Sequence, residues 1–90
     1  MELLPIHYAA AKGDVKSLQA ELDKGVDVNV RGGMSKRSPL MFAADQGHLE
    51  AVKLLVSRKA DLNAGDTDTW TALFWASSGD YIEVARFLLD

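Results

Sequence analysis

Ala43-Ala44-Asp45-Gln46-Gly47-His48 repeats, 34 positions later, the pattern of Ala9-Ala10-Ala11-Lys12-Gly13-Asp14. A third and looser copy is Thr71-Ala72-Leu73-Phe74-Trp75-Ala76. It aligns with Ser38-Pro39-Leu40-Met41-Phe42-Ala43, which lies 33 positions earlier. A fixed period in this range is typical of stacked solenoids, in which each structural unit contacts only its neighbours. The repeat therefore predicts an all-α repeat solenoid.

Each unit reads as a turn, a short helix, a second turn and a second helix. In the middle unit, Ser38 is expected to cap a helix that begins at Pro39, where no amide donor is needed. Gly47 is expected to end that helix in a left-handed conformation. The apolar residues that follow recur at helical spacing and predict the second helix: Leu49, Val52, Leu55 and Val56.

This pattern resembles the ankyrin repeat, whose signature is a Thr-Pro-Leu-His-x-Ala helix start within about 33 residues. The segments that carry the resemblance are Pro5-Ile6-His7-Tyr8-Ala9-Ala10, Ser38-Pro39-Leu40-Met41-Phe42-Ala43-Ala44, the second helix from Gly47 to Leu55, and Asp61-Leu62-Asn63. The resemblance covers nearly the whole chain. It implies helix-turn-helix pairs joined by β-hairpin-like fingers, and His7 and His48 in structural roles.

The predicted organisation is one ankyrin-repeat domain over residues 1–90. Repeat 1 spans about 1–29 and forms an N-terminal cap, repeat 2 spans about 30–63, and repeat 3 spans about 64–90 and is truncated or C-terminal. The last helix is apolar almost all round, which predicts burial of its faces. Three explanations stay open: a truncated chain, self-association through Val84 and Phe87, or an apolar end that docks a partner.

Several positions depart from the family's pattern. The first finger, 30–38, carries one extra residue, a Gly-Gly pair and three cations, whereas the second finger, 64–71, is acidic at its tip. Thr69 and Lys59 stand where the family usually has glycine, so strain or rearrangement is expected at both turns. Gly79 falls one place early relative to Gly47, which leaves the third inter-helix turn uncertain.

Composition excludes several classes of function. The net charge of -3 gives no dense basic face for nucleic acid or acidic membranes, and the chain has no cysteine. No apolar run approaches the ~20 residues that span a bilayer. We therefore expect neither a nucleic-acid nor a membrane partner. A cytoplasmic location is the default expectation, with a removed signal peptide as the alternative.

No motif of enzyme chemistry stands out, so the prediction is a non-enzymatic chain without metal or cofactor. There is no Gly-rich phosphate loop, no His-Glu-x-x-His and no Gly-x-Ser-x-Gly. Asp66-Thr67-Asp68 resembles the opening of a calcium loop, but the distal glutamate is missing at the required spacing. These carboxylates are expected to be solvated at the fingertip.

Aromatic side chains carry the functional signal. Tyr8, Phe42 and Trp75 occupy the same place in successive first helices, and the resemblance places this position beside the concave groove. Large aromatics suit binding because they bring much contact area with few torsions to freeze. The alternative is packing between each first helix and its finger.

The predicted function is binding of another protein through the concave face of the fingers and first helices. The expected partner-binding residues are Tyr8, Lys12, Met34, Arg37, Phe42, Asp45, Gln46, Asp68, Trp70, Trp75 and Ser78. Two alternatives stay open. One is an inhibitor that docks on an enzyme and blocks its site, and the other is a fragment or self-associating structural repeat.

Overall fold

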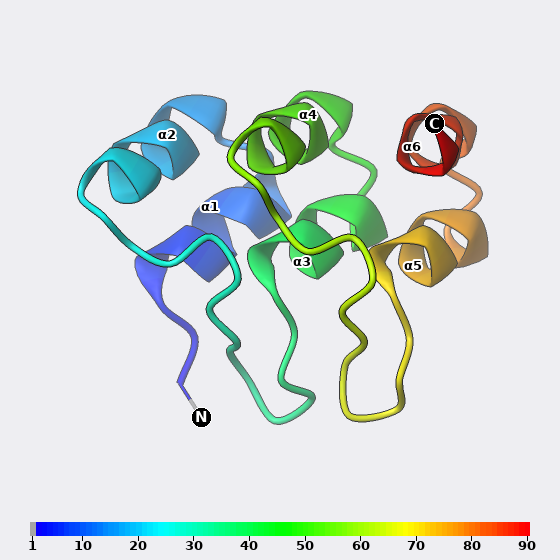
Figure 1. Ribbon diagram of the computed structural model, residues 1–90, viewed down its shortest axis with the longest axis horizontal. Helices are drawn as coiled ribbons and strands as arrows, with labels where there is room; N and C mark the ends of the chain where they lie inside the picture. The colour runs from blue at the N-terminus through cyan, green and yellow to red at the C-terminus, as the bar shows by residue number, and fades with distance from the viewer. Residues whose placement is uncertain (1) are drawn as a thin grey trace.

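The computed structural model describes residues 2–90, and within this range it contains six helices arranged in three pairs (Figure 1). In chain order they are α1 (Pro5–Lys12), α2 (Val15–Asp23), α3 (Pro39–Asp45), α4 (Leu49–Ser57), α5 (Ala72–Ser78) and α6 (Ile82–Leu89). An isolated antiparallel bridge between Gly32 and Arg37 closes the first finger. The predicted all-α repeat solenoid is confirmed.

The pairs stack side by side along the longest dimension of the molecule, whose extents are 31 × 25 × 20 Å. In Figure 1, α1, α3 and α5 form one layer and α2, α4 and α6 form a second layer. The fingers that precede α3 and α5 hang below the first layer, on the side away from the second helices. Each first helix therefore lies between its partner helix and the fingers.

Three of the six helices described within residues 2–90 start at a residue whose side chain caps them. Ser38 Oγ accepts the Met41 N–H at 3.4 Å, and Thr71 Oγ1 accepts the Phe74 N–H at the same distance. At the start of α2, the Asp14 carboxylate accepts the Ser17 hydroxyl at 2.8 Å and the Ser17 N–H at 3.1 Å. These two hydrogen bonds hold the pKa of Asp14 below its ordinary value.

Both histidines have structural roles. His7 Nδ1 accepts the Leu4 N–H at 2.9 Å, so its Nε2 is the nitrogen that donates to Val30 O in the first finger at 2.8 Å. His48 Nε2 bonds Ala11 O of the preceding helix pair at 3.0 Å. Each ring thus ties one repeat unit to the next.

The core runs through all three helix pairs. Alanines with no exposed surface let α1, α3 and α5 approach closely, and branched aliphatic side chains fill the layer toward the second helices. The core includes Ile6, Ala10, Leu18, Leu40, Ala43, Ala44, Val52, Leu55, Ala76 and Val84.

One prediction about the last helix is wrong. Val84 is 2% exposed and belongs to the core, so it does not provide a surface for self-association. Its side of α6 is shared with Leu88, one helical turn later, and this side faces the rest of the protein. Phe87 is partly buried against the same core. The exposed apolar side chains of α6 are instead Ile82 and Leu89.

The turns that lack the expected glycine keep the left-handed conformation. Lys59 has φ 73°, Thr69 has φ 67°, and Asp80 has φ 64°. Asp80 takes the place of Gly47, while Gly79 has an ordinary φ of -85°. The surrounding hydrogen bonds hold these residues in place, so the turns are strained rather than rearranged.

We expect Lys59→Gly to stabilise the protein by about 1 kcal/mol, because glycine adopts a positive φ without a Cβ penalty. The matched control is Gly25→Lys at the equivalent turn of the first unit, where φ is 97° and a Cβ would meet open space. It should lose about 1 kcal/mol through strain alone. Urea unfolding followed by circular dichroism measures both changes. A Lys59→Gly protein less stable than the native chain would contradict the expectation.

No helix within residues 2–90 combines the length and the apolar character needed to cross a membrane.

Candidate functional site

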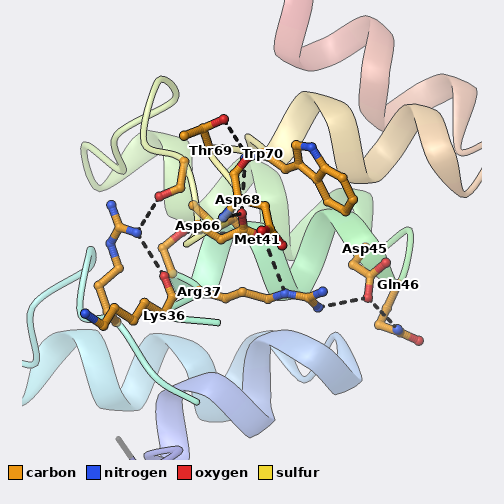
Figure 2. Close-up of polar contacts among 12 residues, drawn as sticks. Lys36, Arg37, Met41, Asp45, Gln46, Asp66, Asp68, Thr69 and Trp70 are labelled. Carbon is orange, nitrogen blue, oxygen red and sulfur yellow. Dashed lines mark hydrogen bonds and ion pairs between the residues drawn. The ribbon is translucent and has the colours of Figure 1, made fainter. Parts of the chain in front are cut away.

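Arg37, at the end of the first finger, is the centre of a group of side chains from both fingers and two first helices (Figure 2). Its guanidinium lies 3.5 Å from Asp45 Oδ2 and 3.9 Å from Asp66 Oδ2. Its Cζ lies 3.8 Å from the centre of the Trp75 ring and 5.9 Å from that of Phe42. We call these five residues, Arg37, Phe42, Asp45, Asp66 and Trp75, the Arg37 cluster.

The first finger is shaped to deliver Arg37 to this place. Gly32 and Arg37 exchange backbone hydrogen bonds of 2.9 and 3.0 Å, and Gly33 and Lys36 form the tip with positive φ. Gly32 lies so close to the His7 ring that a Cβ at this position would overlap the ring. The extra residue and the Gly-Gly pair therefore make a closed hairpin against α1.

Hydrogen bonds also join the two fingers. Arg31 Nη1 donates to Lys36 O at 2.9 Å within its own finger and to Gly65 O of the second finger at 2.6 Å. The Thr67 N–H donates to Ser35 O at 3.0 Å. Arg31 thus has a structural role, and the fingers present one continuous surface.

Asp66 organises the second finger, and its position corrects the prediction of a solvated carboxylate. Its side chain is 1% exposed, and Oδ1 accepts the N–H groups of Asp68 at 2.9 Å and Trp70 at 3.1 Å. Asp68 remains exposed. The signal for this role was present in the sequence, because aspartate often accepts backbone N–H groups a few residues later in a turn.

The aromatic side chains form a second group next to the Arg37 cluster. The rings of Trp70 and Phe74 stack at 4.3 Å, and Trp70 meets Trp75 edge-on at 5.3 Å. Trp70 is 41% exposed and Phe74 is 38% exposed. Sequence reasoning missed Phe74, which joins this group through its stacked contact with Trp70.

Most of the predicted site residues lie on this surface. Arg37, Phe42, Asp45 and Trp75 belong to the Arg37 cluster, and Trp70 is adjacent. Beside them, Gln46 Nε2 donates to Asp45 Oδ2 at 3.2 Å. Met34 lines a shallow hollow of about 210 Å³ with Phe42 and Arg37. Asp68 follows Asp66 at the second fingertip, and Ser78 is exposed at the end of α5.

Two predicted residues lie elsewhere. Tyr8 and Lys12 line a hollow of about 290 Å³ at the α1–α2 end, together with Asp14, Ser17 and Glu21. The equivalent aromatics Phe42 and Trp75 are half-buried because Arg37 lies over both rings. Phe42 thus packs against its own finger, which is the alternative that the sequence left open, whereas Trp75 contacts the preceding unit's finger through Arg37 and its own finger through Trp70. The three aromatics therefore do not form one evenly exposed stripe.

The Arg37 cluster brings opposite charges and aromatic rings together. One guanidinium faces two carboxylates, and no histidine lies within the Arg37 cluster. Within residues 2–90 no group of three or more His, Cys, Asp or Glu side chains is arranged to hold a metal ion. The surface carries the ion pairs of Arg37 with two carboxylates and the exposed rings of Trp70 and Phe74. It also carries the polar groups of Gln46 and Asp68.

Three stacked helix pairs with hairpin fingers define a helical-repeat protein built to present an extended surface. A family model described as ankyrin repeats, in three copies, matches residues 6–90. The chain therefore belongs to the ankyrin repeat family, and the predicted resemblance is confirmed. Ankyrin repeats are protein–protein interaction modules.

Two known proteins with similar sequences are much longer than this chain. The chain is 35% identical over 88 residues to the human transient receptor potential cation channel subfamily A member 1, covering 96% of this chain and 8% of the channel protein. It is 36% identical over 86 residues to the probable E3 ubiquitin-protein ligase XBOS33 of Oryza sativa subsp. japonica, covering 94% of this chain and 16% of the ligase. The chain thus spans less than a fifth of either relative.

A solved structure shows the same fold. It is the predatory endopeptidase Bd0816 of Bdellovibrio bacteriovorus in complex with the immunity protein Bd3460. One chain of this complex superposes with a TM-score of 0.90 and 31% sequence identity. The match covers 99% of the present chain and 46% of the chain in the complex.

Proposed function

We propose that this chain binds another protein through the surface formed by its fingers and first helices. We call this the finger–helix surface, and it consists of the Arg37 cluster together with Met34, Gln46, Asp68 and Trp70. The observation that carries the proposal is the position of Arg37, which lies over Trp75 and between Asp45 and Asp66. This arrangement places the guanidinium against an aromatic ring and two carboxylates before any partner arrives.

Two features of this surface favour binding. Arg37 is already fixed by its ion pairs and its contact with Trp75, so a partner that touches it causes little further loss of side-chain entropy. Trp70 adds a large, partly exposed ring, and tryptophan and arginine are enriched among residues that dominate binding energy. Gln46 and Asp68 supply polar groups at the border, as in typical protein interfaces.

The shape of the surface favours a protein partner over a small molecule. The hollow beside Met34 has a volume of about 210 Å³, below the roughly 300–1,000 Å³ of typical small-molecule pockets. Met34 itself is 94% exposed at the fingertip, and a flexible methionine adapts well to a partner's surface. A broad surface with a projecting finger suits contact with another folded protein.

A more specific candidate is an inhibitor that docks on an enzyme. The similar solved chain belongs to a complex that joins an endopeptidase and an immunity protein. Proteins that block an active site need a rigid surface with projecting elements, and the two hydrogen-bonded fingers provide such elements. An activity assay on the captured partner separates an inhibitor from an adaptor.

The test is affinity capture from the source organism, followed by titration with the purified partner. The variant combines Gln46→Arg with Asp68→Arg, because both side chains are exposed and neither belongs to the core. The matched control is Gln19→Arg with Glu50→Arg, which makes the same change in net charge at exposed positions on the second helices. We expect at least tenfold weaker binding for the first variant and an unchanged dissociation constant for the control. Equal binding by both variants would contradict the proposed site.

A further inference from the structure

Met34, at the tip of the first finger, carries an accessible thioether. Met34 is 94% exposed, whereas Met41 in α3 is 1% exposed. The chain has no cysteine, and its third methionine, Met1, lies outside the described residues. Within residues 2–90, Met34 therefore holds the one sulfur atom that solvent reaches freely.

Backbone hydrogen bonds hold the loop that presents Met34. Gly33 and Lys36 have φ values of 79° and 53°, and the Lys36 N–H donates to Gly33 O at 3.2 Å. From the second finger, the Thr67 N–H donates to Ser35 O at 3.0 Å. The loop thus keeps its shape without using the Met34 side chain, so a chemical change at the thioether should leave the fold intact.

An exposed thioether reacts with peroxides. A sulfur lone pair attacks one oxygen of hydrogen peroxide, the O–O bond breaks and an S–O bond forms. The methionine is oxidised by two electrons to a sulfoxide, and the peroxide is reduced to water. Because the oxidant must reach the sulfur atom, the difference in exposure predicts that Met34 reacts and Met41 is protected. Methionine sulfoxide reductases reverse the reaction.

Oxidation changes what the fingertip offers to a partner. Met34 lines the hollow of about 210 Å³ together with Phe42 and Arg37 of the Arg37 cluster. The thioether is apolar and flexible, whereas the sulfoxide is polar and its oxygen needs a hydrogen-bond donor. Water supplies this donor in the free chain, and a covering partner removes the water. The Arg37 guanidinium is already held between Asp45 and Asp66. The sulfoxide therefore disfavours the complex and not the free fold.

We propose that Met34 is a site of reversible oxidation by peroxide, and that its sulfoxide weakens binding of a partner at the finger–helix surface. The second part rests on the proposed function, because it requires the partner to cover Met34. The same contact shields the sulfur atom from peroxide. A bound partner should therefore slow the oxidation of Met34.

The first test treats the full chain with hydrogen peroxide in the absence of any partner. Trypsin cleaves after Arg31, Lys36 and Arg37, so Met34 and Met41 fall in different peptides that mass spectrometry follows separately. We expect Met34 to be oxidised at least about tenfold faster than Met41, with an unchanged circular dichroism spectrum. Methionine sulfoxide reductases with dithiothreitol should restore the thioether. Equal rates at the two methionines, or unfolding when only Met34 is oxidised, would overturn the proposal.

The second test is titration of the oxidised chain with the partner purified by affinity capture. We expect oxidation to raise the dissociation constant at least about fivefold and reductase treatment to restore it. Met34→Leu is compared with itself before and after peroxide, and the treatment should not change its dissociation constant. Met41→Leu nearly conserves the core volume and should stay as sensitive to peroxide as the native chain.

The variant that combines Gln46→Arg with Asp68→Arg distinguishes this proposal from the proposed function. If that variant weakens binding but oxidation of the native chain does not, the binding surface stands and the role of Met34 is overturned. If neither change weakens binding, the proposed surface is itself wrong, and the role of Met34 falls with it. A loss of affinity in oxidised Met34→Leu as large as in the native chain would assign the effect to another residue and overturn the proposal.

Discussion

Leu40→Ala is expected to destabilise the protein by about 2–4 kcal/mol, enough to leave part of the chain unfolded at room temperature. Leu40 is 1% exposed and lies in α3, which packs against both α1 and α5. Shortening the leucine to alanine leaves a cavity in α3, the first helix of the middle unit, which contacts the first helices on both sides. The packing of α3 against α1 and its packing against α5 therefore weaken together. A stack of about three repeats is near the minimum for cooperative folding, which leaves little stability to lose.

Urea unfolding measures this effect, with circular dichroism for the helices and fluorescence for the tryptophans. Leu62→Ala is the matched control, because Leu62 is 40% exposed and should cost less than about 1 kcal/mol. If Leu40→Ala cost no more than Leu62→Ala, the central packing role of α3 would be wrong. The same measurement must accompany any binding assay, since loss of the fold also abolishes binding.

Asp66→Ala is expected to destabilise the protein by about 2–3 kcal/mol through a different mechanism. The buried carboxylate is the acceptor for two backbone N–H groups of its own finger and lies 3.9 Å from Arg37. Removing it leaves two donors without their acceptor and takes one of two carboxylates away from a cation that is only 22% exposed. Arg37 should then lose its fixed position over Trp75, and partner binding should weaken as well.

Two further variants separate the contribution of the Asp66 charge from the contributions of its hydrogen bonds and its burial. Asp66→Asn keeps a side-chain oxygen for the N–H groups of Asp68 and Trp70 but removes the charge, so it should cost less than Asp66→Ala. Asp68→Ala changes an exposed carboxylate in the same finger and should cost no more than about 0.5 kcal/mol. A cost for Asp66→Ala as small as that for Asp68→Ala would show that the buried position of Asp66 does not matter.

The helices and their turns were predictable because their causes are local. Ser38 caps α3 through a hydrogen bond to a residue three positions away, and Gly47 ends the first helix of that pair by its own freedom at positive φ. The 34-residue period adds long-range information, because a unit that is repeated must bury the same face against its neighbour each time. For this reason the order of the helices and the stack follow from the chain's own pattern, whereas the structural roles of the two histidines were implied by the resemblance to the ankyrin repeat.

The contents of the candidate site depended on contacts between units, which no local pattern contains. Arg37 and Asp66 lie on different fingers, and they meet only because the stacking brings those fingers side by side. The same stacking buries Val84 and leaves Ile82 exposed, although both are apolar residues of one short helix. Local sequence determines which backbone conformation each segment adopts, since capping and glycine effects act over three or four residues. Only the packing of units in three dimensions decides which side chains meet, because burial depends on neighbours that are distant in the chain.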